Sequence, residues 1–267
     1  MEVKDRLFLL RSKLTNTKEK NIDYCSFERL LNVRFLRETG RNATFYDKES
    51  KMNFYDPRAL AFIYEIETVD FFANTSQHLH KATEFIRRVN YKYDWIQIKV
   101  NDKRKVISIE NKEELKERWS RLKAAILKDY KGDVVEYALS KIDNQFETDN
   151  QINLALFEYM YFGLIFPQIP KWHKNEWENN RFIKFSEYEN EKFEENIKYL
   201  KNDGDKRIYE ITGKTLQESK TSINEYKGHI SVINDNIFPE DLELNIEFVR
   251  DNVVNRWSFE LLCYNNK

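Results

Sequence analysis

Hydrophobic and polar residues alternate most clearly between residues 91 and 127. A period-2 pattern, which places one side of a strand in a core and the other in water, is carried by Ile96, Gln97, Ile98, Lys99 and Val100. A polar turn over 101–103 reverses the chain, and residues 106–109 return it. This stretch predicts a β-hairpin with one buried and one solvated face.

A helix is predicted directly after this hairpin. Its apolar residues recur at helical spacing and form one stripe: Leu115, Trp119, Leu122 and Ile126. Asn111 precedes the stripe, and Glu114 lies three residues after Asn111. The two residues therefore predict a capping box at the start of the helix. Hairpin and helix together are the strongest local signal in the chain.

The remaining pattern predicts further helices and strands. Helical periodicity is found over residues 1–14, from Ser76 to about residue 89, after Gly132, and over 150–166, where the helix is apolar nearly all round. In the segment after Gly132, the residues expected to face inward are Val134, Val135, Ala138, Leu139 and Ile142. Strand-like alternation is found in short pieces over 24–55 and over 62–72, 181–188, 207–212, 226–233, 242–249 and 254–264.

Two of these elements resemble two others. Residues 62–66 (FIYEI) resemble 207–211 (RIYEI), and the hairpin 96–109 resembles 244–259, at similar separations along the chain. One interpretation is a duplicated β-unit on either side of a helical middle. The alternative is chance, because alternating hairpins resemble one another by construction.

The pattern therefore predicts an α+β fold in which antiparallel hairpins and sheets flank a central helical segment. We expect an α+β region over 1–178, with strands over about 24–110, helices over about 111–166 and a linker-like stretch over 167–178. A β-rich region follows over 179–267, and it could pack as one unit with the first.

Composition and charge limit the class of protein. The chain is 41% hydrophobic, which is enough to fill a core, and 33% charged, with a net charge of −1, which argues against coating nucleic acid through overall charge. Two cysteines make no disulfide framework. The charged start and the absence of a long apolar run favour a cytoplasmic protein without membrane insertion. Frequent Lys, Asn and Ile indicate an AT-rich genome, bacterial or phage.

Several kinds of catalytic site are missing from the sequence. The six glycines are scattered, so they form neither a dinucleotide-binding fingerprint nor a phosphate-binding P-loop. There is no His-Glu-x-x-His and no Cys-x-x-Cys. We therefore predict no catalytic residues, no metal site and no cofactor.

The best candidate for recognition of a partner is an aromatic segment that follows two prolines. It contains Trp172, His173, Glu176 and Trp177. Exposed aromatic side chains of this kind anchor binding partners. The alternative is that the tryptophans fold back and cover the end of the preceding apolar helix.

A second candidate is a basic segment over residues 87–105. Its cationic side chains are interleaved with tyrosines and a tryptophan, an arrangement that binds single-stranded nucleic acid; they are Arg87, Arg88, Lys92, Lys99, Lys103, Arg104 and Lys105. The competing interpretation is a solvated hairpin face that pairs with the acidic C-terminal third.

Isolated polar residues give weaker signals. Asp94, Gln97 and Lys99 resemble the acidic-then-Gln-x-Lys arrangement of restriction-like nucleases, in which the residues bind a metal ion. Glu158 lies inside the most apolar helix, where burial would raise its pKa. A pair of histidines at 78 and 80 lacks a third metal ligand.

These observations favour a non-enzymatic cytoplasmic factor that binds another protein, as an immunity-like, adaptor or accessory protein does. The alternative is a divergent metal-dependent nuclease or another nucleic-acid-binding protein that uses the 87–105 segment. A third class, small-ligand binding in the C-terminal β-region, requires a sizeable apolar cavity there.

Overall fold

The structure is a computed structural model, and it describes most of the chain. The described residues are 27–55, 61–75, 80–101, 106–156, 162–167, 169, 177–183, 192–216, 221–233 and 239–265. The predicted helix over 1–14 and the proposed capping residue Ser76 lie outside them.

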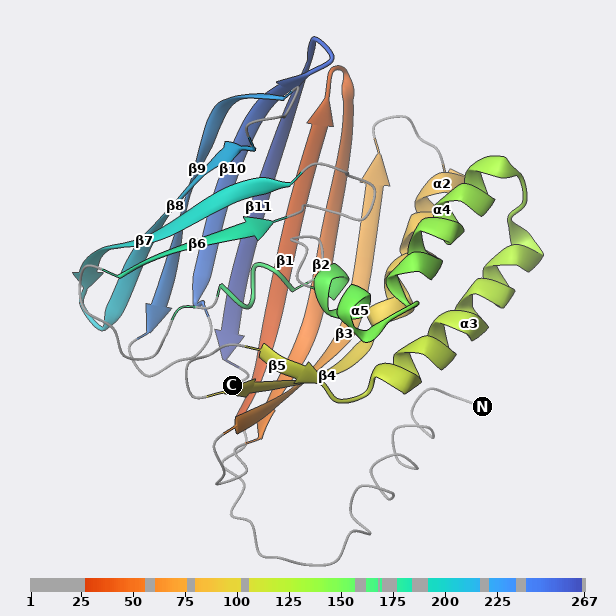
Figure 1. Ribbon diagram of the computed structural model, residues 1–267, viewed down its shortest axis with the longest axis horizontal. Coiled ribbons are helices and arrows are strands. Elements are labelled where there is room, and N and C mark those ends of the chain that lie inside the picture. Colours follow the sequence, from red (N-terminus) through yellow and green to blue (C-terminus); the bar gives the residue numbers. More distant parts are fainter. Residues whose placement is uncertain are drawn as a thin grey trace, which may run out of the picture.

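One antiparallel sheet of eleven strands forms the frame of the molecule (Figure 1). Its order is β5-β4-β3-β2-β1-β11-β10-β9-β8-β7-β6. The strands are β1 Phe27–Thr39, β2 Asn42–Tyr55, β3 Ala61–Thr75, β4 Trp95–Asn101, β5 Val106–Ile109, β6 Glu178–Ile183, β7 Phe193–Asp203, β8 Lys206–Thr215, β9 Ser222–Ile233, β10 Asp241–Arg250 and β11 Val253–Asn265. The prediction of antiparallel sheet with helices is confirmed at this level.

The sheet consists of two runs of neighbouring strands that meet in its centre. β1 to β5 step outward to one edge, and β6 to β11 step back inward from the other edge. β11 then pairs with β1, with Cys263 opposite Leu31 and Phe259 opposite Phe35. Strands from both regions expected from the sequence therefore belong to one sheet.

Three two-residue turns connect long strands in this sheet. Gly40 begins the β1–β2 turn at φ 57°, and Gly204 begins the β7–β8 turn at φ 63°. The β10–β11 turn uses Asp251 and Asn252, both at positive φ. Such turns match the right-handed twist of the strands, and Gly, Asn and Asp tolerate the left-handed backbone that they require.

The helices gather beside β3 and β4 (Figure 1). They are α2 His80–Asn90, α3 Lys112–Asp129, α4 Asp133–Gln145 and α5 Asp149–Leu156, with a short 3-10 turn, η1 Tyr91–Tyr93, after α2. The stripe expected on α3 is buried at Leu115, Trp119 and Ile126. Helix α4 begins after Gly132 as predicted, but Val134 faces solvent and is 83% exposed.

The face of the sheet that packs against the helices is called the inner face here. Leu31, Val33 and Phe35 of β1 alternate onto it, and the other long strands continue it across the sheet. The ring centroids of Phe193 on β7 and Phe248 on β10 are only 5.8 Å apart although two strands separate them. Because flat neighbouring strands lie about 4.8 Å apart, the sheet must curl around its inner face.

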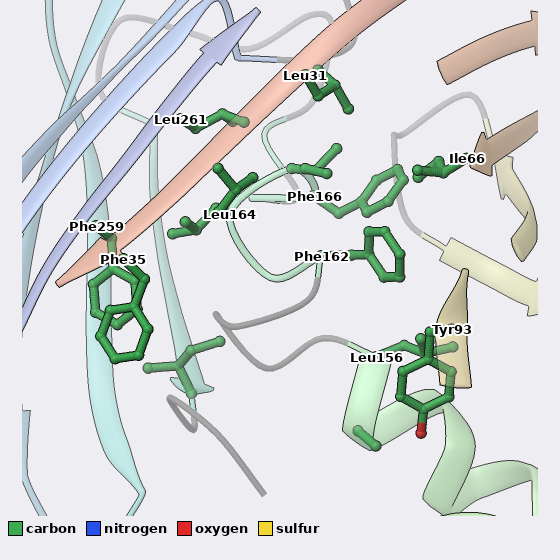
Figure 2. Packing of buried hydrophobic residues seen from close by; sticks show 14 of the residues in the cluster. Leu31, Phe35, Ile66, Tyr93, Leu156, Phe162, Leu164, Phe166, Phe259 and Leu261 are labelled. Carbon is green, nitrogen blue, oxygen red and sulfur yellow. The ribbon is translucent and has the colours of Figure 1, made fainter. Parts of the chain in front are cut away.

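The core between the sheet and the helices is completed by a tight turn over residues 162–166, called the central turn here. Figure 2 shows Phe162, Leu164 and Phe166 between residues of the two halves of the molecule. The Phe166 ring lies edge-on to Tyr64 of β3, with centroids 6.3 Å apart. The predicted helix over 150–166 is therefore wrong at its end, because α5 is followed by turns at 162–165.

Two further expectations are corrected by the structure. The Asn111 side chain makes no capping bond with α3; its Oδ1 accepts from the Gln97 amide at 2.9 Å, and its Nδ2 donates to the Trp95 carbonyl at 3.1 Å. The sequence pattern also missed β7, whose inward position 195 holds a glutamate instead of an apolar residue. In both places a polar side chain, that of Asn111 or Glu195, forms hydrogen bonds with groups that are distant in the sequence.

The resembling elements occupy different places in the sheet. Hairpin β4–β5 lies at one edge, whereas hairpin β10–β11 lies at the centre. Strand β3 pairs with β2 and β4, and β8 pairs with β7 and β9. Duplication stays a prediction.

Candidate functional site: the outer face of the sheet

The second face of the sheet, called the outer face here, is polar along the central strands. Residues directly opposite each other on neighbouring strands share a face, so the register defines rows that run across the sheet. The first row is Glu38, Arg256, Glu247 and Glu225; the second is Leu36, Ser258, Asn245 and Lys227; the third is Asp47, Arg34, Glu260, Glu243, His229 and Glu210.

Two adjoining hollows lie on this face. One, of about 370 Å³, is lined by residues of the first and middle rows that include Leu36, Glu225 and Asn245. The other, of about 260 Å³, shares Glu225 and Asn245 and extends to Glu210. Together they form a shallow groove across the strands, with carboxylates from the first and third rows at its two sides.

Small polar side chains make the floor of this groove. Ser258 Oγ donates to Asn245 Oδ1 at 2.8 Å, which satisfies both groups across β10 and β11. The short side chains of Ser258 and Asn245, at the centre of the middle row, leave the longer carboxylates of the flanking rows standing above them. The groove is thus a consequence of residue size along three rows and not of a gap in the sheet.

Some of the carboxylates have basic partners. Glu247 accepts from Asn224 at 3.0 Å and from the Arg256 Nε at 2.6 Å, and these bonds, the first more than the second, lower the pKa of Glu247. Arg34 lies between Asp47, at 3.4 Å, and Glu260, at 3.3 Å. The groove therefore contains fixed ion pairs beside carboxylates that have no ion pair among the described residues.

The register also places like charges directly opposite each other. Glu225 on β9 faces Glu247 on β10, and Glu243 on β10 faces Glu260 on β11. Like charges in such positions destabilise a sheet. Among the residues that the structure describes, Glu225 and Glu243 have no ion pair within 4.0 Å.

The arrangement on the outer face is suited to binding by charge and hydrogen bonding. Within the described ranges, no group of three His, Cys, Asp or Glu residues could hold a metal ion. His229, the one imidazole at the groove, has its Nε2 3.7 Å from Asp241 Oδ1 and has no nucleophile beside it in the described lining. No described helix is long and apolar enough to cross a membrane.

The predicted aromatic segment is described only at its end. Trp172, His173 and Glu176 lie outside the described residues. Trp177 is half-buried, and its ring meets Tyr209 edge-on at 5.7 Å, while its carbonyl accepts from the Tyr199 amide at 2.9 Å. Trp177 thus packs on β7 and β8, and the alternative interpretation, in which the tryptophans cover the end of the preceding helix, stays a prediction.

The basic side chains of 87–105 that the structure describes do not form one surface. Arg88 pairs with Asp129 of α3 at 2.5 Å, and Arg87 lies 3.8 Å from Glu84. Lys92 is fully buried. The remaining members are Lys99, on the outer face of β4, and Lys103, Arg104 and Lys105, which lie outside the described residues.

The basic hairpin and the acidic C-terminal third lie apart. β4 is separated from β10 by β3, β2, β1 and β11. Lys99 therefore cannot neutralise the carboxylates of the groove. The expectation that these two oppositely charged regions face each other is wrong for the part of the hairpin that the structure describes.

The nuclease-like residues are also not brought together. Asp94 bonds to Arg118 of α3, on the helix side of the sheet. Gln97 and Lys99 occupy the opposite, outer face of β4, where the inward positions are taken by Ile96 and its neighbours. Glu158 and His78 lie outside the described residues, as does the side chain of His80.

A buried polar cluster was not predicted from the sequence. Arg181 Nε donates to Glu195 Oε1 at 2.7 Å, and the Tyr226 hydroxyl donates to Glu195 Oε2 at 2.8 Å. Arg181 also donates to the carbonyls of Gly163 and Phe166 at 3.4 and 3.3 Å. The cluster therefore ties the central turn to β6, β7 and β9.

Burial controls the protonation of this cluster. It raises the pKa of Glu195 to about 8, against the opposing effect of the Tyr226 hydrogen bond. It also lowers the pKa of Arg181 to about 10 and raises the pKa of Tyr226. A cluster so enclosed has a structural role in holding the central turn.

A buried lysine contacts the central turn from the other half of the sheet. Lys48 of β2 is 4% exposed, and its Nζ lies 4.6 Å from the centre of the Phe162 ring. Burial, and secondly the charge of Lys92, lowers the pKa of Lys48 to about 7, while Asp94 acts in the opposite direction. The central turn is thus held between two polar contacts.

Comparisons with known proteins give no family for this chain. No family model matches it, and no curated protein matches it. Among solved structures, a lipovitellin is similar with a TM-score of 0.43 and 9% identity; the similarity covers 91% of this chain and 25% of that one. The chain thus spans about a quarter of the lipovitellin, and a similarity this weak carries no argument about function.

Proposed function

We propose that this protein is a non-enzymatic binding factor whose partner, another protein, docks on the outer face of the sheet. The class is that of an immunity-like, adaptor or accessory protein acting in the cytoplasm. The observation that carries the proposal is the difference between the two faces of the sheet. The inner face is buried in the core, whereas no described element covers the outer face.

The size of the outer face supports a protein partner. Five strands, β8 to β11 and β1, at a spacing of about 4.8 Å, and ten residues at about 3.4 Å each give a surface of roughly 800 Å². This is about one side of a protein–protein interface of standard size. The groove on it, about 370 and 260 Å³ in its two parts, is open and polar, as suits a macromolecule more than a small apolar ligand.

Rigidity of the outer face also favours docking. Its side chains project from long paired strands, so little backbone order has to be gained when a partner binds. Cross-strand bonds such as Ser258 to Asn245 hold the floor in place before binding. The proposal therefore places recognition on the sheet and not on the Trp172–Trp177 segment, where the described Trp177 packs inward.

The test uses a partner recovered with the tagged chain from its host and then purified separately. Isothermal titration measures its binding to the wild type and to Asn245→Trp, which fills the floor of the groove. Ser140→Trp, on an exposed position of α4, is the matched control. We expect Asn245→Trp to weaken binding at least tenfold and Ser140→Trp to leave it unchanged.

Two results would refute the proposal. Equal binding by the wild type and Asn245→Trp, with both proteins folded by circular dichroism, would remove the outer face as the docking site. Chemical conversion of the partner by the purified chain would remove the non-enzymatic class.

A further inference from the structure

The outer face carries more negative charge than its own side chains neutralise. The three rows contain seven carboxylates and three Lys or Arg side chains, namely Glu38, Asp47, Glu210, Glu225, Glu243, Glu247 and Glu260 against Arg34, Lys227 and Arg256. A fourth basic side chain, Lys198 on β7, lies opposite Glu210. Arg34 and Arg256 are already engaged with Glu260 and Glu247. The remaining carboxylates give the groove a net negative potential.

Glu225 and Glu243 each lie directly opposite another carboxylate on the neighbouring strand, a position in which like charges destabilise a sheet. Glu225 opposes Glu247, and Glu243 opposes Glu260, in adjacent rows of the same three strands. A lysine on either member of each pair would remove the repulsion, as Lys51 opposite Glu67 does on β2 and β3. Arg256 and Arg34 already pair with Glu247 and Glu260, so a cation from outside the sheet would chiefly pair with Glu225 and Glu243, which have no ion pair among the described residues.

The groove also has a direction. Its hollows run across the strands, because Leu36 on β1 lines one end and Glu210 on β8 lines the other. Five strands at about 4.8 Å give a length of roughly 19 Å between the outer two. An extended polypeptide of about six residues covers this distance at about 3.3 Å per residue.

We infer that the groove between the first and third rows binds an extended, Lys- or Arg-rich segment of the partner protein. Basic side chains of the segment reach the carboxylates on both sides, and its backbone lies over Ser258 and Asn245. The inference rests on the proposed function, since it names the chemistry of the partner that docks on the same face.

Charge complementarity explains why a basic polypeptide is favoured over a metal ion. The carboxylates stand in rows along the groove and do not converge on one point, and no metal-binding group of three is found among the described residues. A chain with cations at regular intervals can meet several of them at once, which a single ion cannot.

The test uses the full chain and a ten-residue peptide of alternating Lys and Thr, with Glu-Thr and Gln-Thr peptides of the same length as controls. Fluorescence anisotropy measures binding at 50 and 300 mM salt. We expect saturable binding of the Lys-Thr peptide alone, weakened at least tenfold at the higher salt because the charges are screened.

The decisive variant is Glu225→Gln with Glu243→Gln. It should bind the Lys-Thr peptide at least tenfold more weakly and, in the absence of peptide, melt at a higher temperature than the wild type, because the opposed charges are gone. Glu114→Gln with Glu117→Gln, on the exposed side of α3, removes the same charge and should change neither property in this way.

Three outcomes would overturn the inference. The first is equal binding of the Lys-Thr peptide by both double variants, and the second is binding of the Gln-Thr peptide as tight as that of the Lys-Thr peptide. The third is displacement of the Lys-Thr peptide by millimolar calcium or magnesium when sodium chloride of the same ionic strength does not displace it. If the purified partner still loses affinity for Asn245→Trp while these peptides fail, the proposed function stands and only the chemistry of the partner is wrong.

Discussion

Arg181 and Glu195, on neighbouring strands β6 and β7, form a hydrogen-bonded pair at 2.7 Å that lies under the central turn. Both side chains are buried, and the same guanidinium binds two carbonyls of that turn. The pair connects the edge of the sheet, which β6 forms, to the middle of the core. Several measurable properties of the protein follow from this and similar contacts.

Glu195→Gln should flatten the dependence of stability on pH. The folded-state pKa of Glu195 is raised to about 8 from 4.5, so its stabilising effect is complete below pH 4.5 and is lost as the pH rises through 8. The wild-type free energy of unfolding should fall across this window by a few kcal/mol, on the order of 1.4 kcal/mol for each unit of pKa. Gln mimics the protonated carboxyl and lacks this slope.

Urea denaturation at pH 5, 6.5 and 8 measures this effect. Glu194→Gln, on the outward side of the same strand, controls for loss of a carboxylate. Parallel pH curves for the wild type and Glu195→Gln would contradict the assignment of the slope to Glu195.

Lys48→Met should stabilise the protein most at and below neutral pH. Burial lowers the folded-state pKa of Lys48 to about 7 from 10.5, so its contribution is present above pH 10.5 and is lost as the pH falls through 7. Met keeps an apolar contact with Phe162 without a charge to desolvate. We expect a gain of about 1–4 kcal/mol at pH 6, the range seen when buried ionic groups are replaced by well-packed apolar ones.

The measurement is denaturant unfolding from pH 6 to 9, with Lys51→Met, outward on the same strand, as the control. A gain for Lys48→Met that is equal at every pH, or a loss of stability at pH 6, would show that desolvation of Lys48 is not the cause.

Gly213→Ala should destabilise the buried cluster by steric conflict. A Cβ at this position would lie 2.6 Å from the Tyr226 ring, which must then move away from Glu195. Overpacking of this kind costs about 1–3 kcal/mol. Gly228→Ala should be worse, because there the nearest atom is the backbone carbonyl of Glu243, which cannot rotate away. Thermal melts rank the two variants, and the reverse order would contradict the packing described.

Asn111→Ala should loosen the joint between α3 and β4. It removes one acceptor for the Gln97 amide and one donor to the Trp95 carbonyl, and unsatisfied buried groups of this kind cost about 1–3 kcal/mol. Hydrogen exchange provides a local readout, since the Gln97 amide should exchange faster while amides in β10 stay protected. An unchanged exchange rate of the Gln97 amide would contradict a stabilising role for its bond to the Asn111 side chain.

Much of the strand pattern could be predicted from the sequence, because alternation survives wherever inward positions are apolar. β10 and β11 show this, with Leu244 and Phe259 inward and Asn245 and Ser258 outward. Strand β7 was missed because Glu195 interrupts its inward series, and hydrogen bonds from Arg181 and Tyr226 on other strands make a buried carboxyl acceptable there. The end of α5 was misplaced because apolar residues fill a turn as readily as a buried helix.

The candidate site was harder to predict than the strands. Glu225, Glu243 and Glu247 are visible as outward positions of strands, and the local acidity of the C-terminal third is plain in the sequence. The sequence does not reveal the register, which places Glu225 opposite Glu247. It also does not reveal the strand order, which separates these glutamates from the basic hairpin. Both are long-range properties of the sheet.

The central pairing of β1 with β11 has a consequence for how the sheet is assembled. Every other pair in the sheet joins consecutive strands of the chain, whereas Leu31 and Cys263 must close a loop of more than two hundred residues. Loop closure of this length is entropically costly, and contacts of high sequence separation form late. We therefore expect the two outer runs of strands to form first and the seam between them to limit the folding rate.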